Sequence, residues 1–171
     1  MKNYTKIINQ NYRSFGHQEK SNWCWAATSS NVARGKSVVI GQCHIANLCL
    51  TQCSNNCTAQ SCNQPHYLHE ALKNIKSFNK WVPGKLPRHQ VKSELNANRT
   101  IGVRIAWQGS NNGHFILIFG YAIFHKARPD LHYFVFDPLK SYGVQLLRAS
   151  ALESTNGYQL AGTWSETILT N

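Results

Sequence analysis

The chain has 171 residues, of which 42% are apolar and 11% aromatic, a composition that excludes a disordered or collagen-like protein and fits one compact domain with a hydrophobic core. Eighteen Lys and Arg against seven Asp and Glu give a formal charge of +11, which favours anionic partners such as nucleic acid, acidic proteins or anionic lipid. The basic residues are spread along the chain without a block of like charge, so a dedicated nucleic-acid arm is not expected, whereas a folded basic face stays open. No apolar run is long enough to span a bilayer, and residues 1–16 lack the apolar centre of an ordinary secretory signal.

Helical signals fill the first half of the chain after a polar, irregular segment at residues 1–20. The stretch "NWCWAATSSNVAR" predicts a helix over residues 22–34, with Asn22 as its N-cap and Gly35 as its stop, and so places Cys24 in the first helical turn. A shorter helix is predicted near residues 44–50, another beginning at Pro65, and a fourth within residues 86–99.

After Thr100 the pattern becomes extended. The runs "IGVRIAW", "HFILIFGYAIF", "HYFVFD", "GVQLLR" and "GTWSETILT" are rich in β-branched and aromatic residues and are separated by Gly, Asn, Pro and Lys. Helices first and strands second predict an α+β fold with an antiparallel sheet. We therefore expect one domain over residues 1–171, with a helical half at about 18–98 packed on a β half at about 100–170 and a cleft between them.

Cys24 is the first candidate for chemistry. A thiol attacks best as the thiolate, and the free amides and dipole at a helix N-terminus stabilise that negative charge. Nucleophilic catalysis also requires a base, a group that orients the base, and donors for an oxyanion. Taken alone, a buried cysteine is more often inert packing, so the case depends on whether the chain supplies these partners.

His114 and Asp137 are the best partners among the histidines and carboxylates. His114 begins a predicted strand directly after Gly113, which lets a backbone or a substrate come close. Asp137 ends the next apolar strand, and Pro138 biases it toward an extended backbone. If the two runs form an antiparallel hairpin, the start of one strand lies beside the end of the other. Asp137 can then accept the imidazole N–H, whereas Asp130 falls at the exposed far end.

Gln18 and the residues around Cys24 complete the candidate site. Gln18 stands six residues before Cys24, and its side-chain amide is a neutral donor that can bind an oxyanion beside the Cys24 backbone N–H. Trp23, Trp25 and Gly113 are candidate residues of a substrate cleft. Trp107 and Trp164 are expected to be structural, with either able to shield the His–Asp pair from water.

Five further cysteines lie in a polar segment at residues 41–65, and three interpretations remain open for them: disulfides, zinc or free thiols. Disulfides are favoured because they would hold a loop that is poor in apolar residues. Two bonds leave one thiol over, and the sequence does not fix the pairing. The spacing is not a standard zinc signature, so no metal is expected. The candidates are Cys43, Cys49, Cys53, Cys57 and Cys62.

The ordered set Gln18, Cys24, His114 and Asp137 resembles the papain-like cysteine proteases. Together "QEKSNWCWAA", "QCHIAN", "CNQPHYLHEAL", "GHFILIFGY", "FDPL" and "GTWSETILT" are similar to a compact bacterial branch of that superfamily, which includes avirulence-type effector proteases. The resemblance spans about residues 18–170. It implies Cys24 as nucleophile, His114 as general base and acid, Asp137 as the orienting carboxylate where papain has asparagine, and Gln18 as oxyanion donor.

The expected function is therefore a cysteine endopeptidase that hydrolyses peptide bonds through a Cys–His–Asp triad, without a cofactor. Its partner would be a protein or peptide substrate, with acidic substrates suited to the basic chain, and we expect a monomer. Two alternatives stay open: a deamidase, transglutaminase or isopeptidase with the same acyl-thioester chemistry, and a basic toxin module that binds RNA or another anion. We expect a secreted protein, or one delivered into a target cell by a dedicated secretion system.

Overall fold

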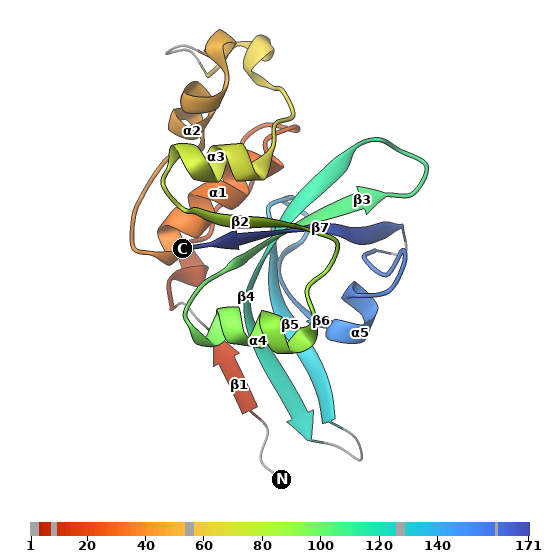
Figure 1. Ribbon diagram of the computed structural model, residues 1–171. Coiled ribbons are helices and arrows are strands. Elements are labelled where there is room, and N and C mark those ends of the chain that lie inside the picture. The colour runs from red at the N-terminus through yellow and green to blue at the C-terminus, as the bar shows by residue number, and fades with distance from the viewer. Residues whose placement is uncertain (1–3, 8–9, 54–56, 126–128, 160) are drawn as a thin grey trace.

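The computed structural model describes residues 4–7, 10–53, 57–125, 129–159 and 161–171 (Figure 1). The helices are α1 Cys24–Gly35, α2 Gln42–Cys49, α3 Leu68–Asn74, α4 Arg88–Asn96 and α5 Ala149–Leu152. Short 3₁₀ turns lie at Gln10–Ser14, Thr51–Cys53 and Gln60–Cys62. The strands are β1 Tyr4–Ile7, β2 Phe78–Pro83, β3 Ile101–Trp107, β4 Gly113–His125, β5 Pro129–Asp137, β6 Gly143–Arg148 and β7 Gly162–Thr170.

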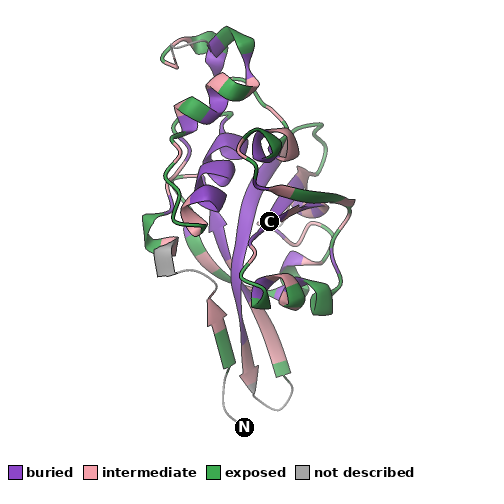
Figure 2. Ribbon diagram, turned by 60° about the vertical axis from the view of Figure 1, so that its left-hand side comes forward, coloured by how far each residue is buried: buried purple, intermediate pink, exposed green. Residues whose placement is uncertain are grey.

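Within the described ranges the strands form one seven-stranded sheet in the order β2-β7-β3-β4-β5-β6, with β1 paired to β4 beyond the end of β3. All of its pairings are antiparallel. Helices α1, α2 and α3 gather on one side of this sheet, and α4 and α5 lie against the other (Figure 1). Figure 2 shows α1 and the middle of the sheet as buried, whereas the outer turns are exposed.

Two hydrophobic cores fill the spaces on either face of the sheet. Because strand side chains alternate between faces, Phe115 and Leu117 of β4 pack with α1, α2 and α3. Ile116, on the opposite face of the same strand, packs with Val91 and Leu95 of α4. β4 is thus buried from both sides, and the residues at its start are held by a rigid element.

Helix α1 is buried along almost its whole length, from Cys24 to Ala33. Its small residues let it lie close to the sheet, where the Thr28 hydroxyl donates to the Phe115 carbonyl oxygen at 3.2 Å. The Asn31 amide bonds both backbone groups of Gly16, accepting from its N–H at 2.8 Å and donating to its C=O at 3.0 Å. These bonds fix α1 against β4 and fix the preceding loop against α1.

The α+β fold class is confirmed, and the differences from the predicted elements are local. The polar N-terminal segment contributes β1, and β2 lies within the expected helical half but pairs with β7. Helix α3 begins at Leu68 rather than at Pro65, and α5 was not predicted. Trp23, not Asn22, is the N-cap of α1, because Asn22 is engaged with Asn63 through its backbone and its side chain.

No helix in the described part of the chain has both the length and the apolar character needed to cross a bilayer.

Candidate active site

Cys24 is the first residue of α1, and its side chain faces His114 near the start of β4. Its neighbour Trp23, in the N-cap position, makes no side-chain capping bond. The first-turn amides of a helix have no intrahelical partner, and the first α-type bond here runs from the Ala27 N–H to the Trp23 carbonyl. The thiol therefore stands at the positive end of the α1 dipole, next to amides that can bind a developing negative charge.

His114 and Asp137 come together because of the register between β4 and β5. Leu117 pairs with Phe136, so Asp137, at the end of β5, lies opposite the beginning of β4. Alternation puts His114 and Asp137 on the same face of the sheet. The His114 Nε2 donates to the Asp137 Oδ1 at 2.7 Å, and both side chains are buried, with exposures of 7% and 0%.

The other side of the imidazole faces the Cys24 thiol, with which it is hydrogen-bonded. Burial by itself lowers the pKa of His114, but hydrogen bonds and charge attraction to Asp137 and Cys24 outweigh burial and raise it from 6.5 to about 9. The imidazole therefore holds a proton at neutral pH, between a sulfur atom and a carboxylate.

The Asp137 carboxylate is itself held by two further donors. The Leu139 backbone N–H donates to Oδ1 at 2.8 Å, and the Tyr158 hydroxyl donates to Oδ2. Burial and the adjacent Asp137 charge raise the pKa of Tyr158 far above its usual range, so the phenol stays protonated and remains a donor. Sequence reasoning missed Tyr158, because a single tyrosine in the polar stretch "STNGYQLAG" carries no periodic signal.

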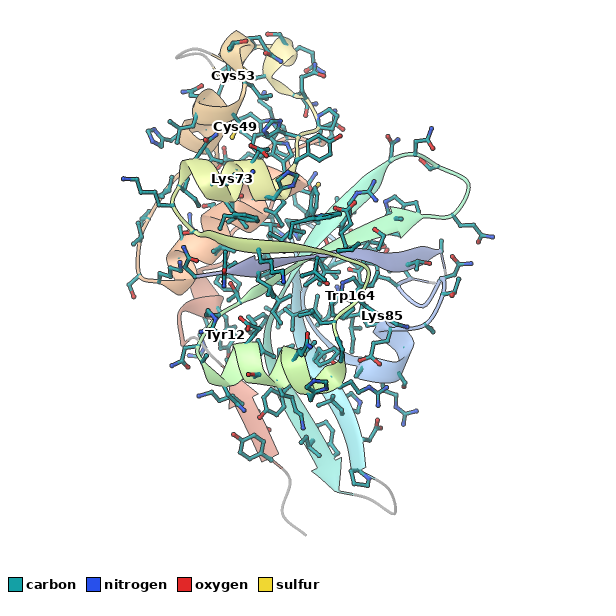
Figure 3. All side chains as sticks on the ribbon, viewed as in Figure 1. Tyr12, Cys49, Cys53, Lys73, Lys85 and Trp164 are labelled. Carbon is teal, nitrogen blue, oxygen red and sulfur yellow. A yellow bond between two sulfur atoms is a disulfide. The ribbon has the colours of Figure 1, made fainter. Side chains whose placement is uncertain are left out.

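Of the two tryptophans considered as shields, Trp107 covers the His114 ring. The two rings are stacked, with centroids 6.3 Å apart and an interplanar angle of 22°, and Trp107 also contacts the Tyr158 ring. Trp164 is buried in the core on the far side of the sheet from α1, and its indole N–H donates to Thr167 Oγ1 at 3.0 Å. Figure 3 labels Trp164 beside the strands, well apart from the helices that carry Cys49 and Cys53.

A cavity of about 690 Å³ opens in front of Cys24 and His114. One wall comes from the helical side, with Trp25 and the segment from Pro65 to Tyr67, and the other from β3 and the start of β4, with Arg104 and Gly113. Trp25 and Gly113 thus lie where the sequence suggested. Trp23 does not: it is buried in the core, where its indole N–H donates to the Cys62 carbonyl at 2.7 Å.

Arg104 is a lining residue that sequence reasoning missed, although a lone charge inside the apolar run "IGVRIAW" was the signal for it. Its guanidinium lies across Gly113, where a Cβ atom would come within 2.7 Å of Nε. It is partly paired with Glu166, with 3.6 Å between Nε and Oε1. No Asp or Glu is among the described residues that line the cavity, so the space beside His114 is cationic.

Gln18 is close to the site but is not aimed into the cavity. Its backbone N–H donates to the Pro138 carbonyl at 2.8 Å, which ties its loop to the end of β5. Its side-chain amide donates to the Lys20 and Ser21 carbonyls at 3.0 and 2.7 Å. Its Oε1 is buried without a partner among the described residues. Both amide hydrogens are therefore engaged, and an oxyanion would have to draw one of them away.

The cysteine-rich segment contains two pairs at disulfide distance, Cys43 with Cys57 and Cys53 with Cys62. Cys49 is the thiol left over, and burial raises its pKa. Across the described residues, no group of three or more His, Cys, Asp or Glu side chains is arranged to hold a metal ion.

A thiol and an imidazole–carboxylate pair that meet at the wall of a cavity, between a helical layer and an antiparallel sheet, define a cysteine hydrolase with the architecture of papain. The family described as papain-like cysteine protease AvrRpt2 matches residues 6–147, and the chain belongs to this family of effector-type cysteine proteases. No curated protein matches the chain.

Proposed function

We propose that the protein is a cysteine endopeptidase in which Cys24 is the nucleophile, His114 the general base and acid, and Asp137 the group that orients the imidazole. The observation that carries this proposal is the position of His114, which bonds the Asp137 carboxylate at 2.7 Å through Nε2 and the Cys24 thiol through its other side. The family membership supports a proteolytic reaction.

The reaction follows from this arrangement. Because His114 holds a proton at neutral pH, Cys24 reacts as the thiolate of an ion pair with the imidazolium, and this thiolate attacks the carbonyl carbon of a peptide bond. As the carbon–nitrogen bond breaks, the His114 imidazolium gives its proton to the leaving amine, and a thioester remains on Cys24. Water then attacks the thioester while His114 takes a proton from it. The intermediate then expels Cys24 as the thiolate, the carboxylic acid product leaves, and the ion pair with the His114 imidazolium is restored.

The oxyanion of each tetrahedral intermediate is proposed to be bound by the Cys24 backbone N–H at the start of α1. Gln18 is proposed as the second donor, and binding would transfer one of its amide hydrogens from the Ser21 carbonyl to the oxyanion. Such bonds often tighten only in the complex with substrate. A weaker oxyanion site costs catalysis rather than binding, because the charge exists only in the transition state.

The substrate is proposed to be a protein segment with an acidic side chain next to the scissile bond. The cavity is large enough for a side chain together with adjoining backbone, and such sites commonly bury most of their ligand. Arg104 brings a permanent positive charge to it, and its pairing with Glu166 is loose enough, at 3.6 Å, to be exchanged for a substrate carboxylate.

The experiment that tests the proposal is to profile a peptide library with the wild-type protein and with Cys24→Ala, followed by mass spectrometry. Cleavage by the wild type alone, with new termini in the products, is expected. A one-dalton gain without cleavage would instead identify a deamidase, and a cross-link would identify a transferase. Equal cleavage by both proteins would refute the role of Cys24. The library is run with and without reductant, because the thiol must be reduced while the two cysteine pairs need not be.

We also propose that the protein is exported into an oxidising environment or delivered to a target cell. The support is the pairing of Cys43 with Cys57 and of Cys53 with Cys62, since disulfides persist mainly outside the reducing cytosol. Thiol counting on denatured protein from the producing cell's medium is expected to give two free thiols, those of Cys24 and Cys49. Six free thiols would refute the proposal.

A further inference from the structure

Tyr158 contacts the candidate site but lies outside the part of the chain that the family matches, which ends at residue 147. Tyr158 is 2% exposed, and its hydroxyl donates to the Asp137 Oδ2. The His114 Nε2 and the Leu139 N–H both bond the other oxygen, Oδ1. The Tyr158 hydroxyl is also hydrogen-bonded with the side chains of Gln145, at 3.4 Å, and Gln159. Tyr158 is thus the side chain that holds the second oxygen of the orienting carboxylate.

The backbone around Tyr158 is built to keep the ring in this place. Its N–H donates to the Gly162 carbonyl at 2.9 Å, and the Gly162 N–H returns a bond at 2.8 Å. A Cβ atom at Gly162 would come within 2.4 Å of Ile105 and 2.9 Å of the Trp107 ring. This close approach lets the Tyr158 ring contact Trp107 at a centroid distance of 6.2 Å, while Trp107 covers His114.

We propose, resting on the function proposed above, that Tyr158 is a positioning residue of the catalytic centre, which anchors the Asp137 carboxylate and takes up part of its negative charge so that His114 can release its proton. A hydrogen bond to a carboxylate stabilises its charged form and makes it a weaker acceptor for another donor. His114 must hold its proton firmly enough to keep the thiolate paired, yet give it to the leaving amine. Tyr158 shifts this balance toward release.

The proposal concerns the titration of His114, so the ionisable groups around it matter. From β5 it faces Asp137, and from α1 it faces Cys24. From β3, Arg104 lies across the adjacent Gly113, with Glu166 of β7 as its partner.

Among the residues that the structure describes, few ionisable groups surround Asp137. Tyr158 lies on one of its oxygens and His114 on the other. His17 packs on the neighbouring Phe136 and lies 3.2 Å from the Leu139 carbonyl oxygen. Tyr158→Phe removes one donor from Asp137 and leaves all these other groups in place.

The test compares Tyr158→Phe with Tyr133→Phe as a matched control. Tyr133 lies on β5, the strand that ends at Asp137, and is also buried. Its hydroxyl also donates to a carboxylate, that of Glu153, at 2.8 Å. Each variant loses one hydroxyl and keeps its ring. Two quantities are measured: the midpoint of the His114 titration, followed by NMR of histidine-labelled protein and assigned with His114→Gln, and the separate values of kcat and KM.

For Tyr158→Phe the His114 midpoint is expected to rise by about half to one pH unit, and kcat to fall about tenfold at unchanged KM, as for loss of one hydrogen bond to a charged group. Tyr133→Phe is expected to leave the His114 midpoint and kcat unchanged. Its Tm is expected to fall by about as much as the Tm of Tyr158→Phe. An unmoved or lowered midpoint in Tyr158→Phe would overturn the proposal, as would an equal shift in the control.

The titration keeps this test separate from the proposed function. If the wild type cleaves no peptide, the proposed function fails, and the midpoint still reports whether Tyr158 acts on the Asp137–His114 pair. Protein made with 3-fluorotyrosine, whose hydroxyl is a stronger donor, provides a measurement with the native contacts kept. Its His114 midpoint is expected to fall, and a rise would count against the proposal.

Discussion

Replacing Asp137 with asparagine tests the electrostatics of the site most directly. The pKa of His114 is raised from 6.5 to about 9 although burial lowers it, a net stabilisation of the imidazolium of about 3 kcal/mol. The hydrogen bond to Asp137 is the largest of the interactions that raise it, followed by the hydrogen bond to Cys24 and then by the charge of Asp137. Asp137→Asn keeps the size of the side chain and removes the charge. The His114 pKa is therefore expected to fall by about two units.

The sign of the effect on activity follows from which form of His114 is needed. In the proposed mechanism the imidazolium pairs with the thiolate and protonates the leaving amine, so activity is expected to be lost as pH rises through the His114 pKa. In the wild type this alkaline limb of kcat/KM is expected near pH 9, and in Asp137→Asn near pH 7. The ratio of kcat/KM for the variant to kcat/KM for the wild type should therefore be about tenfold lower at pH 8 than at pH 6.

The assay is the pH profile of kcat/KM from pH 5 to 10 on a fluorogenic peptide chosen from the library. Asp130→Asn is the matched control, because Asp130 lies on the same strand and pairs with Arg148 at 3.0 Å, away from the cavity. Its alkaline limb should coincide with that of the wild type. An alkaline limb that stays at pH 9 in Asp137→Asn, or moves upward, would show that Asp137 does not set the proton affinity of His114.

Two further predictions concern Arg104 in the cavity wall and the disulfides of the cysteine-rich segment. Arg104→Gln is expected to lower kcat/KM about tenfold for peptides with an acidic side chain next to the scissile bond and to leave neutral analogues unchanged, whereas Arg99→Gln, which removes an ion pair with Glu94, should affect neither. Equal losses on acidic and neutral peptides would contradict the acidic preference. Reduction of the two disulfides is expected to lower the free energy of unfolding by about 2–4 kcal/mol, measured by urea denaturation of Cys24→Ala. It should also slow cleavage by the wild type, because the Cys62 carbonyl bonds the Trp23 indole beside Cys24. Identical unfolding curves with and without reductant would refute this prediction.

The positions of Cys24, His114 and Asp137 could be predicted because each lies at the beginning or the end of a helix or strand with a clear sequence pattern. A helix start fixed Cys24, and the ends of two long apolar runs fixed His114 and Asp137. Pairing of those runs as neighbours then followed from antiparallel topology. From the sequence these roles are expectations, and the structure brings the three side chains together.

The features that were missed depend on contacts far apart in sequence. β1 has only four residues, and β2 ends in a proline and is largely exposed, so neither shows a clear alternation. Both become strands because β1 pairs with β4 and β2 pairs with β7. The cysteine pairing is likewise set by the folded path of the loop, and Tyr158 by a turn that returns to the end of β5.

The proposed reacting groups stand at the ends of α1, β4 and β5 and meet only when α1 and the sheet are both in place. Cys24 and Asp137 are separated by most of the helices and strands of the chain, and contacts of this kind form late because loop closure opposes them. A chain that has reached only part of its native structure has a thiol but no imidazolium to pair with it. Catalytic activity is therefore a readout of complete folding, and a partly folded chain is protected from cutting itself or its neighbours.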